Sequence, residues 1–114
     1  MIEFRINHND WDLVLTDESQ LNGNLGMTIF TDYRILLMKS DKHSNMKSAL
    51  IHELTHAFRW SYGNIISDQN KMSISAMDLE EIIANVIEAH GRDIIELSDQ
   101  LWEQIKEELE DDNE

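Results

Sequence analysis

The residues with the clearest chemical potential are two histidines four positions apart, His52 and His56, with Glu53 directly after the first. In an α-helix, residues four apart lie one turn above each other, so both imidazoles project from one face and can share a tetrahedral metal ion. The glutamate can take a proton from metal-bound water, whose pKa bound zinc lowers to about 7. The His-Glu-x-x-His spacing therefore predicts a zinc site for hydrolysis. The competing interpretation is two histidines that serve packing or solubility on an amphipathic helix.

A zinc site of this kind needs a third protein ligand, with the fourth position left to water. The chain has no cysteine, so this ligand must offer nitrogen or oxygen. The best candidate is Glu81, which lies at the start of a periodic apolar stretch beyond the motif. Glu80 is its rival, about 100° around the helix. Either glutamate would also suit a solvated first turn, so the residues alone leave this choice open.

Two helices are expected to carry these groups. Ser44 is a good N-cap for the first, and Gly63 can end it. Ser75 and Asp78 resemble a capping box for the second, which runs to Gly91 and beyond, with Gly91 either breaking or bending it. Apolar residues recur at helical spacing in the first helix, at Met46, Leu50, Leu54, Ala57 and Phe58.

Short strands are expected before these helices. Alternation predicts a strand at residues 2–6. Residues 11–15 are a second candidate strand, although they could equally start a helix. Residues 22–26 carry the strongest turn signal, and residues 27–30 and 34–38 form two further strands. Strands followed by helices predict an α+β fold, a small antiparallel sheet with two to three helices. The motif would lie on the first main helix of this minimal zincin-like domain.

The motif helix and the downstream segment Glu81-Ile82-Ile83-Ala84-Asn85 together resemble the ImmA/IrrE-type metallopeptidases, a gluzincin-like group with many small phage and mobile-element proteins. In that group the second helix reads Glu-x-x-Ala-Asn/Asp, and its glutamate is the third zinc ligand. The resemblance covers roughly residues 22–97, including Gly26-Met27-Thr28. It implies a zinc metallopeptidase in which Glu81 completes the ligand set. The chain departs from the group at Val86-Ile87, where an aromatic residue and alanine are usual.

Composition bounds the remaining possibilities. A chain of 114 residues predicts one domain, residues 1–110, followed by an acidic tail at 111–114 that we expect to be disordered. The net charge of −14 disfavours nucleic-acid binding and mildly favours basic substrates or partners. No apolar run approaches the ~20 residues of a membrane span, and residues 1–20 lack a signal pattern. A cytoplasmic location is therefore expected.

The leading hypothesis is a peptidase: zinc polarises a peptide carbonyl, Glu53 activates water, and an edge strand near residues 34–38 pairs with an extended protein or peptide substrate. The alternative is a non-catalytic, metal-stabilised interaction module, such as a phage accessory protein that binds a host or phage protein. A structural zinc site does not need Glu53, so its presence favours the enzyme. The sequence leaves the oligomeric state and the metal used in the cell open. It also leaves the oxyanion donor open among Tyr33, Arg34, Tyr62 and His90.

Overall fold

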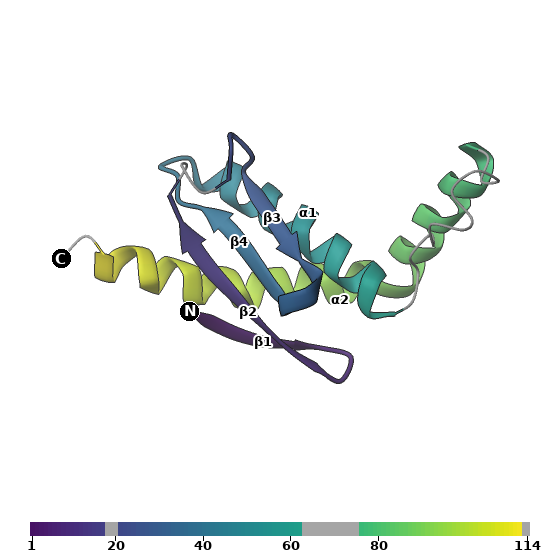
Figure 1. Cartoon of the computed structure of the whole chain (residues 1–114), viewed down its shortest axis with the longest axis horizontal. Helices are drawn as coiled ribbons and strands as arrows, with labels where there is room; N and C mark the ends of the chain where they lie inside the picture. The colour runs from purple at the N-terminus through teal and green to yellow at the C-terminus, as the bar shows by residue number, and fades with distance from the viewer. Residues whose placement is uncertain (18–20, 63–75, 113–114) are drawn as a thin grey trace.

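The protein is described by a computed structural model that covers residues 1–17, 21–62 and 76–112. The strands come first along the chain and two helices follow, so the expected α+β class is confirmed (Figure 1). The elements are β1 (Ile2–Ile6), β2 (Asn9–Thr16), β3 (Gly26–Ile29), β4 (Arg34–Met38), α1 (His43–Ser61) and α2 (Ala76–Asp112).

The four strands form one mixed sheet in the order β1-β2-β4-β3. The pairs β1–β2 and β3–β4 are antiparallel, but β2 and β4 run parallel, with Leu13 opposite Ile35. The prediction of an antiparallel sheet is therefore wrong at its central pair. Because β3 runs back along the outer edge before the chain enters β4, the chain reverses twice and β4 lies beside β2 in the same direction.

The position of β4 also changes which strand can pair with a ligand. β4 is hydrogen-bonded to β2 on one side and to β3 on the other, so the expected free edge at residues 34–38 is wrong. The edge strand on this side is β3. A 3₁₀ turn at Phe30–Asp32 joins β3 to β4, and Tyr33 closes it with a left-handed φ of 51°.

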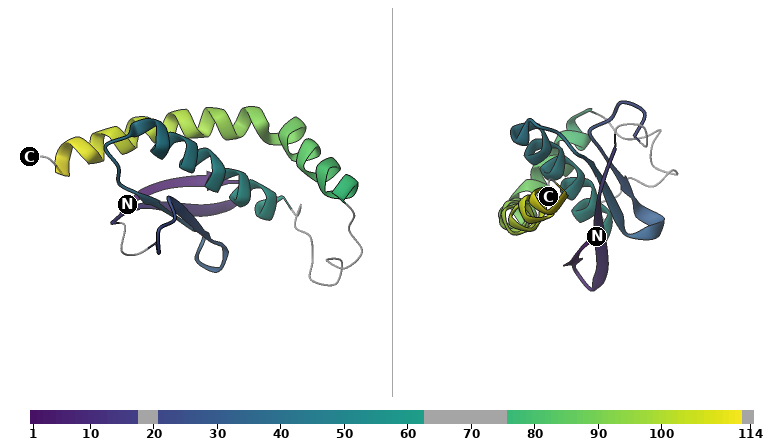
Figure 2. Two further views of the ribbon diagram at one scale, coloured as in Figure 1. Left: turned by 90° about the horizontal axis from the view of Figure 1, so that it is seen from above. Right: turned by 90° about the vertical axis from the view of Figure 1, so that its left-hand side faces the viewer.

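Both helices cover the same face of the sheet (Figure 2). α1 packs on β3 and β4, and α2 packs beside α1 and touches β1. β1 shows the expected alternation, because Ile2, Phe4 and Ile6 are buried while Glu3 and Arg5 are exposed. Each large apolar side chain in this core contributes about 1.5–3 kcal/mol relative to exposure. The α1 side of the core consists of Met46, Ala49, Leu50, Leu54, Ala57 and Phe58.

α1 begins two residues earlier than an N-cap at Ser44 predicts. Lys42 is its N-cap and provides no side-chain hydrogen bond, while Ser44 lies inside the first turn. The Ser44 prediction is therefore wrong. The Ser40 hydroxyl accepts the N–H of Lys42 at 3.0 Å, just before the helix begins. The helix ends at Ser61, and the predicted terminator Gly63 lies outside the described residues.

α2 continues through Gly91 without a break, and it bends so that its first part turns away from the body of the molecule (Figures 1 and 2). It extends into the predicted tail as far as Asp112, while residues 113–114 lie outside the described residues. The predicted capping residue Ser75 also lies outside them. Although α2 has 37 residues, no helix in the described part of the chain is long and apolar enough to cross a membrane.

Candidate metal site

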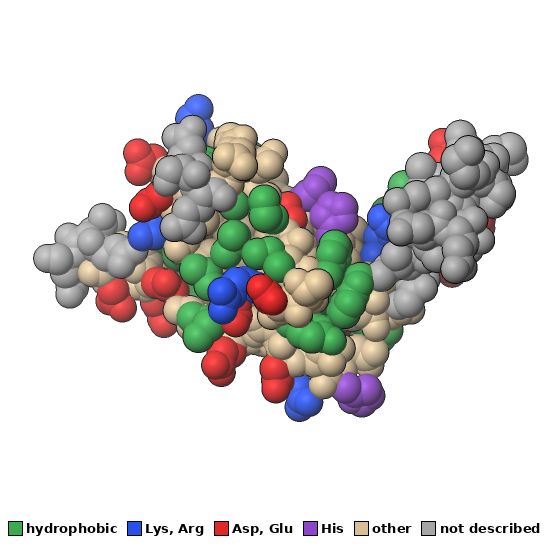
Figure 3. Space-filling view, in the orientation of Figure 1, with side chains coloured by type: hydrophobic (Ala, Val, Ile, Leu, Met, Phe, Trp, Pro, Cys, Tyr) green, Lys and Arg blue, Asp and Glu red, His purple; other side chains and the backbone are tan. Residues whose placement is uncertain are grey.

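The two motif histidines lie together on the outer face of α1. Histidine side chains come to the surface on the face of the molecule seen in Figure 3. The Nε2 atoms of His52 and His56 are 3.2 Å apart, and one ring can donate a hydrogen bond to the other. Two imidazoles bound to one tetrahedral zinc at about 2.0–2.1 Å require a nitrogen–nitrogen separation of about 3.3 Å. The separation of this pair therefore fits a shared metal ion.

The electrostatic environment keeps one of these rings neutral. Burial lowers the pKa of His56 below its usual value, and Glu53 opposes this shift. The charges of His52 and Arg59 lower the pKa further. A neutral imidazole has the lone pair that a metal ligand needs, so His56 is in the form suited to coordination.

Glu53 is the buried member of the motif, with only 7% of its surface exposed. Its Oε1 accepts a hydrogen bond of 2.8 Å from the Thr28 hydroxyl on β3, and its Oε2 lies 4.0 Å from His52 Nε2. Gly26, at the start of β3, makes room for this side chain: a Cβ there would lie 2.9 Å from Glu53 Cγ. The edge strand therefore fixes the carboxylate beside the histidine pair.

Thr28→Val is expected to lower the free energy of unfolding by about 1–3 kcal/mol, because Glu53 loses a donor while remaining buried. Urea denaturation measures this change. Thr55→Val is the matched control, because the Thr55 hydroxyl bonds only to Ile51 O in its own helix in the contacts of the described chain. We expect this control to cost less than about 0.5 kcal/mol. Equal losses in both variants would contradict a special role for Thr28.

The predicted third ligand is not grouped with the histidines. Glu81 and its rival Glu80 are both exposed on the first part of α2. Within residues 1–17, 21–62 and 76–112, no three histidine, cysteine or carboxylate side chains come close enough to hold a metal. The assignment of Glu81 therefore stays a prediction. Among the other histidines, His90 stacks on Tyr62 with ring centroids 4.2 Å apart, and this contact holds α2 against the end of α1.

Hollows open on two sides of His52. The larger, of about 630 Å³, lies between α1 and α2 and is lined by both motif histidines. The smaller, of about 360 Å³, reaches Glu53 from the start of β3. His52 borders both hollows, so a ligand in either can reach it. The smaller hollow is lined by Asn24, Leu25, Gly26, Ser48, Ala49, His52 and Glu53.

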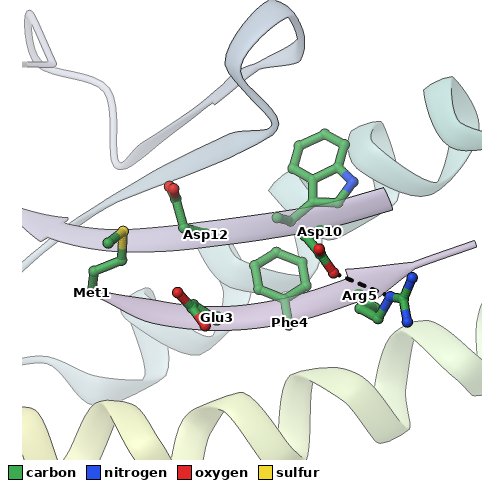
Figure 4. A pocket seen from close by; sticks show the side chains of 7 residues that line it. Met1, Glu3, Phe4, Arg5, Asp10 and Asp12 are labelled. Carbon is green, nitrogen blue, oxygen red and sulfur yellow. Dashed lines mark ion pairs between the residues drawn. The ribbon is translucent and has the colours of Figure 1, made fainter. Parts of the chain in front are cut away.

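A separate hollow of about 370 Å³ lies on the β1–β2 hairpin, where Figure 4 shows several charged side chains. Two of its three carboxylates, those of Asp10 and Asp12, are paired with arginines. Arg5 Nε lies 3.1 Å from Asp10, and Arg34 Nε lies 2.6 Å from Asp12. This hollow lacks a histidine, so it is a weaker candidate site. Arg34, one of the possible oxyanion donors, is therefore already engaged in the ion pair with Asp12.

Sequence reasoning missed the part of β3 that contacts Glu53. It placed Gly26 in a turn and Thr28 in a strand at residues 27–30, and it predicted no contact of either with Glu53. A polar Thr28 between Met27 and Ile29 was the available signal. No protein-family model, curated protein or solved structure matches the chain significantly. The resemblance to ImmA/IrrE-type metallopeptidases thus stays a prediction, and function must be inferred from the chemistry of the site.

Proposed function

We propose that this protein is a zinc-dependent metallopeptidase of the ImmA/IrrE type. The observation that carries the proposal is the 3.2 Å separation of the His52 and His56 Nε2 atoms, with the Glu53 carboxylate 4.0 Å from His52. His52 and His56 would hold the metal, and Glu81 would complete the set. Because Glu81 is not grouped with the histidines, three-ligand binding requires the first part of α2 to approach α1.

A bound zinc ion would polarise the peptide carbonyl and lower the pKa of a coordinated water. Glu53 acts as the general base in this proposal. Its Oε1 is held by Thr28, so Oε2 is the atom turned toward His52 and the one that accepts the proton. A general base works through direct contact or through one water, and a 4.0 Å approach to the ligand atom agrees with such an arrangement.

The edge strand supports a peptide as the substrate. β3 is the outermost strand on this side of the sheet in the described part of the chain, and Thr28 links the same strand to Glu53. An extended peptide can add to such an edge through main-chain hydrogen bonds. Its scissile bond would then lie between β3 and the histidine face of α1. This places the substrate along β3 instead of along residues 34–38.

Metal content tests the first part of the proposal. Protein purified without chelators is expected to contain about one zinc ion per chain by elemental mass spectrometry, and His52→Ala and His56→Ala are expected to lose it. His43→Ala is the matched control. His43 lies on the same helix but packs edge-on against Trp102, so its removal should leave the metal in place.

The same measurement decides the third ligand. Loss of zinc in Glu81→Ala, with retention in Glu80→Ala, would support Glu81, and the opposite result would select Glu80. Protein that holds no metal and takes up none on addition of zinc would exclude the peptidase. That outcome would leave a metal-free interaction module. Zinc retained without any peptide hydrolysis would favour the non-catalytic, metal-stabilised module.

A further inference from the structure

The groove between α1 and α2 is unusually apolar for a surface hollow on an acidic protein. Its volume of about 630 Å³ is within the range of about 300–1,000 Å³ found for ligand sites. Three isoleucines of α2 are exposed at or beside it: Ile83 by 45%, Ile87 by 62% and Ile95 by 47%. Ile51, Val86 and Ile94 complete its apolar lining.

The charged side chains that line the groove, among the described residues, are opposite in sign to the net charge of the chain. The protein has 23 acidic residues and a net charge of −14. Among the described residues, the lining of this groove includes Arg59 and Arg92 and no aspartate or glutamate. Arg92, in a lining whose described residues include no carboxylate, can attract an anionic group. Charges farther away than the Debye length of about 8–10 Å are largely screened.

The groove also adjoins the candidate metal site. His52, His56 and Thr55 form its α1 wall, so an occupant of the groove lies against the histidine pair. The hollow on the other side of His52 is smaller and leads to Glu53 and the start of β3. A peptide bound across the histidines would therefore have one segment in the groove and another in the smaller hollow. The groove would receive the larger apolar segment.

We propose that the α1–α2 groove binds apolar side chains of an extended peptide substrate that also carries an acidic residue, and that Arg92 pairs with this residue. The isoleucines provide the apolar contact, and the absence of carboxylates from the described lining makes the groove compatible with a negative charge. This proposal rests on the proposed peptidase function, since it names the substrate class of that site. It also requires that the movement bringing Glu81 to the histidines leaves Arg92, Ile94 and Ile95 in the lining of the groove. It reverses the preference for basic substrates that the net charge indicates.

Peptide binding tests the proposal without requiring hydrolysis. We would use the Glu53→Gln protein and three fluorescein-labelled peptides: a leucine-rich peptide flanked by glutamate, its lysine-flanked counterpart, and a version with serine for leucine. Fluorescence anisotropy is expected to show about fivefold tighter binding of the glutamate peptide than of the lysine peptide. The serine peptide should bind at least about tenfold more weakly than its leucine counterpart.

Arg92→Glu, made in the same protein, is expected to reverse the preference between the glutamate and lysine peptides. Lys106→Glu is the matched control. It makes the same charge change on the same helix, at a residue paired with Glu103 and outside the groove, and should leave the preference unchanged. High salt should reduce the charge preference but not the leucine preference. Circular dichroism checks that both variants fold.

Equal binding of the leucine and serine peptides, no detectable binding, or an unchanged charge preference in Arg92→Glu would each overturn the proposal. Measuring the zinc content and hydrolysis of the same samples distinguishes failure of the groove proposal from failure of the proposed peptidase function. Selective peptide binding by protein that never takes up zinc would retain the groove and exclude the peptidase. Zinc binding and hydrolysis without the leucine preference would retain the peptidase and exclude the groove as its substrate site.

Discussion

Glu53→Gln is expected to slow peptide hydrolysis by about 10²–10⁴-fold while leaving the zinc content unchanged, because general-base catalysis contributes a factor of this size. Glutamine has nearly the shape of glutamate, and its amide oxygen can accept the 2.8 Å hydrogen bond from Thr28. It cannot take up the proton. The substitution therefore removes the proposed chemistry while retaining the position of the side chain below β3.

The measurement is mass-spectrometric detection of cleaved peptides with zinc-loaded protein, with zinc per chain determined on the same sample. Glu88→Gln is the matched control, because Glu88 is exposed on α2 and does not line either hollow beside the histidines. It should hydrolyse at the parent rate. Equal hydrolysis by the parent and by Glu53→Gln would exclude Glu53 as the base and indicate a contaminating protease.

The fold could be predicted from the sequence where the signals are local. The alternation of buried and exposed residues in β1 and the apolar face of α1 both depend on residues a few positions apart. The parallel pairing of β2 with β4 depends instead on partners 22 residues apart, such as Asp12 and Arg34. When helices cover one face of a sheet, side chains alternate between buried and exposed in the same way in parallel and antiparallel strands. The alternation therefore does not indicate which strand pairs with which, or in which direction.

The candidate site divides in the same way. The His52–His56 spacing predicts a shared face because both residues belong to one helix, and their Nε2 atoms do meet. The support for Glu53 comes from Gly26 and Thr28, which are brought to it by the packing of β3 on α1. Long-range packing also produces the groove with Arg92, which no local pattern indicates. The ligand role of Glu81 was inferred mainly from resemblance and stays untested.

The other large effect is expected at Gly26. Gly26→Ala should lower the free energy of unfolding by about 1–3 kcal/mol, the usual cost of forcing extra atoms into a packed site. Its new methyl group would lie 2.9 Å from Glu53 Cγ and 3.2 Å from Leu36 O. The Leu36 carbonyl belongs to the neighbouring strand β4, so the Glu53 side chain must give way. Gly91→Ala is the control. There the nearest contact is an ordinary 3.5 Å, and the change should stabilise the helix by about 0.5–1 kcal/mol.

A double-mutant cycle with Glu53→Ala shows which neighbour resists the methyl group. Alanine at position 53 lacks both Glu53 atoms that approach Gly26, so Gly26→Ala should cost much less in this background, with a coupling of about 1–2 kcal/mol by urea denaturation. An equal cost in both backgrounds would mean that the Leu36 carbonyl alone resists the methyl group.

If Gly26 does position the general base, Gly26→Ala should also lose hydrolysis while retaining zinc, because the histidines lie outside this contact. A variant that loses stability but keeps hydrolysis would show that Gly26 serves packing only. The Glu53 carboxylate would then be oriented by Thr28 without a contribution from Gly26.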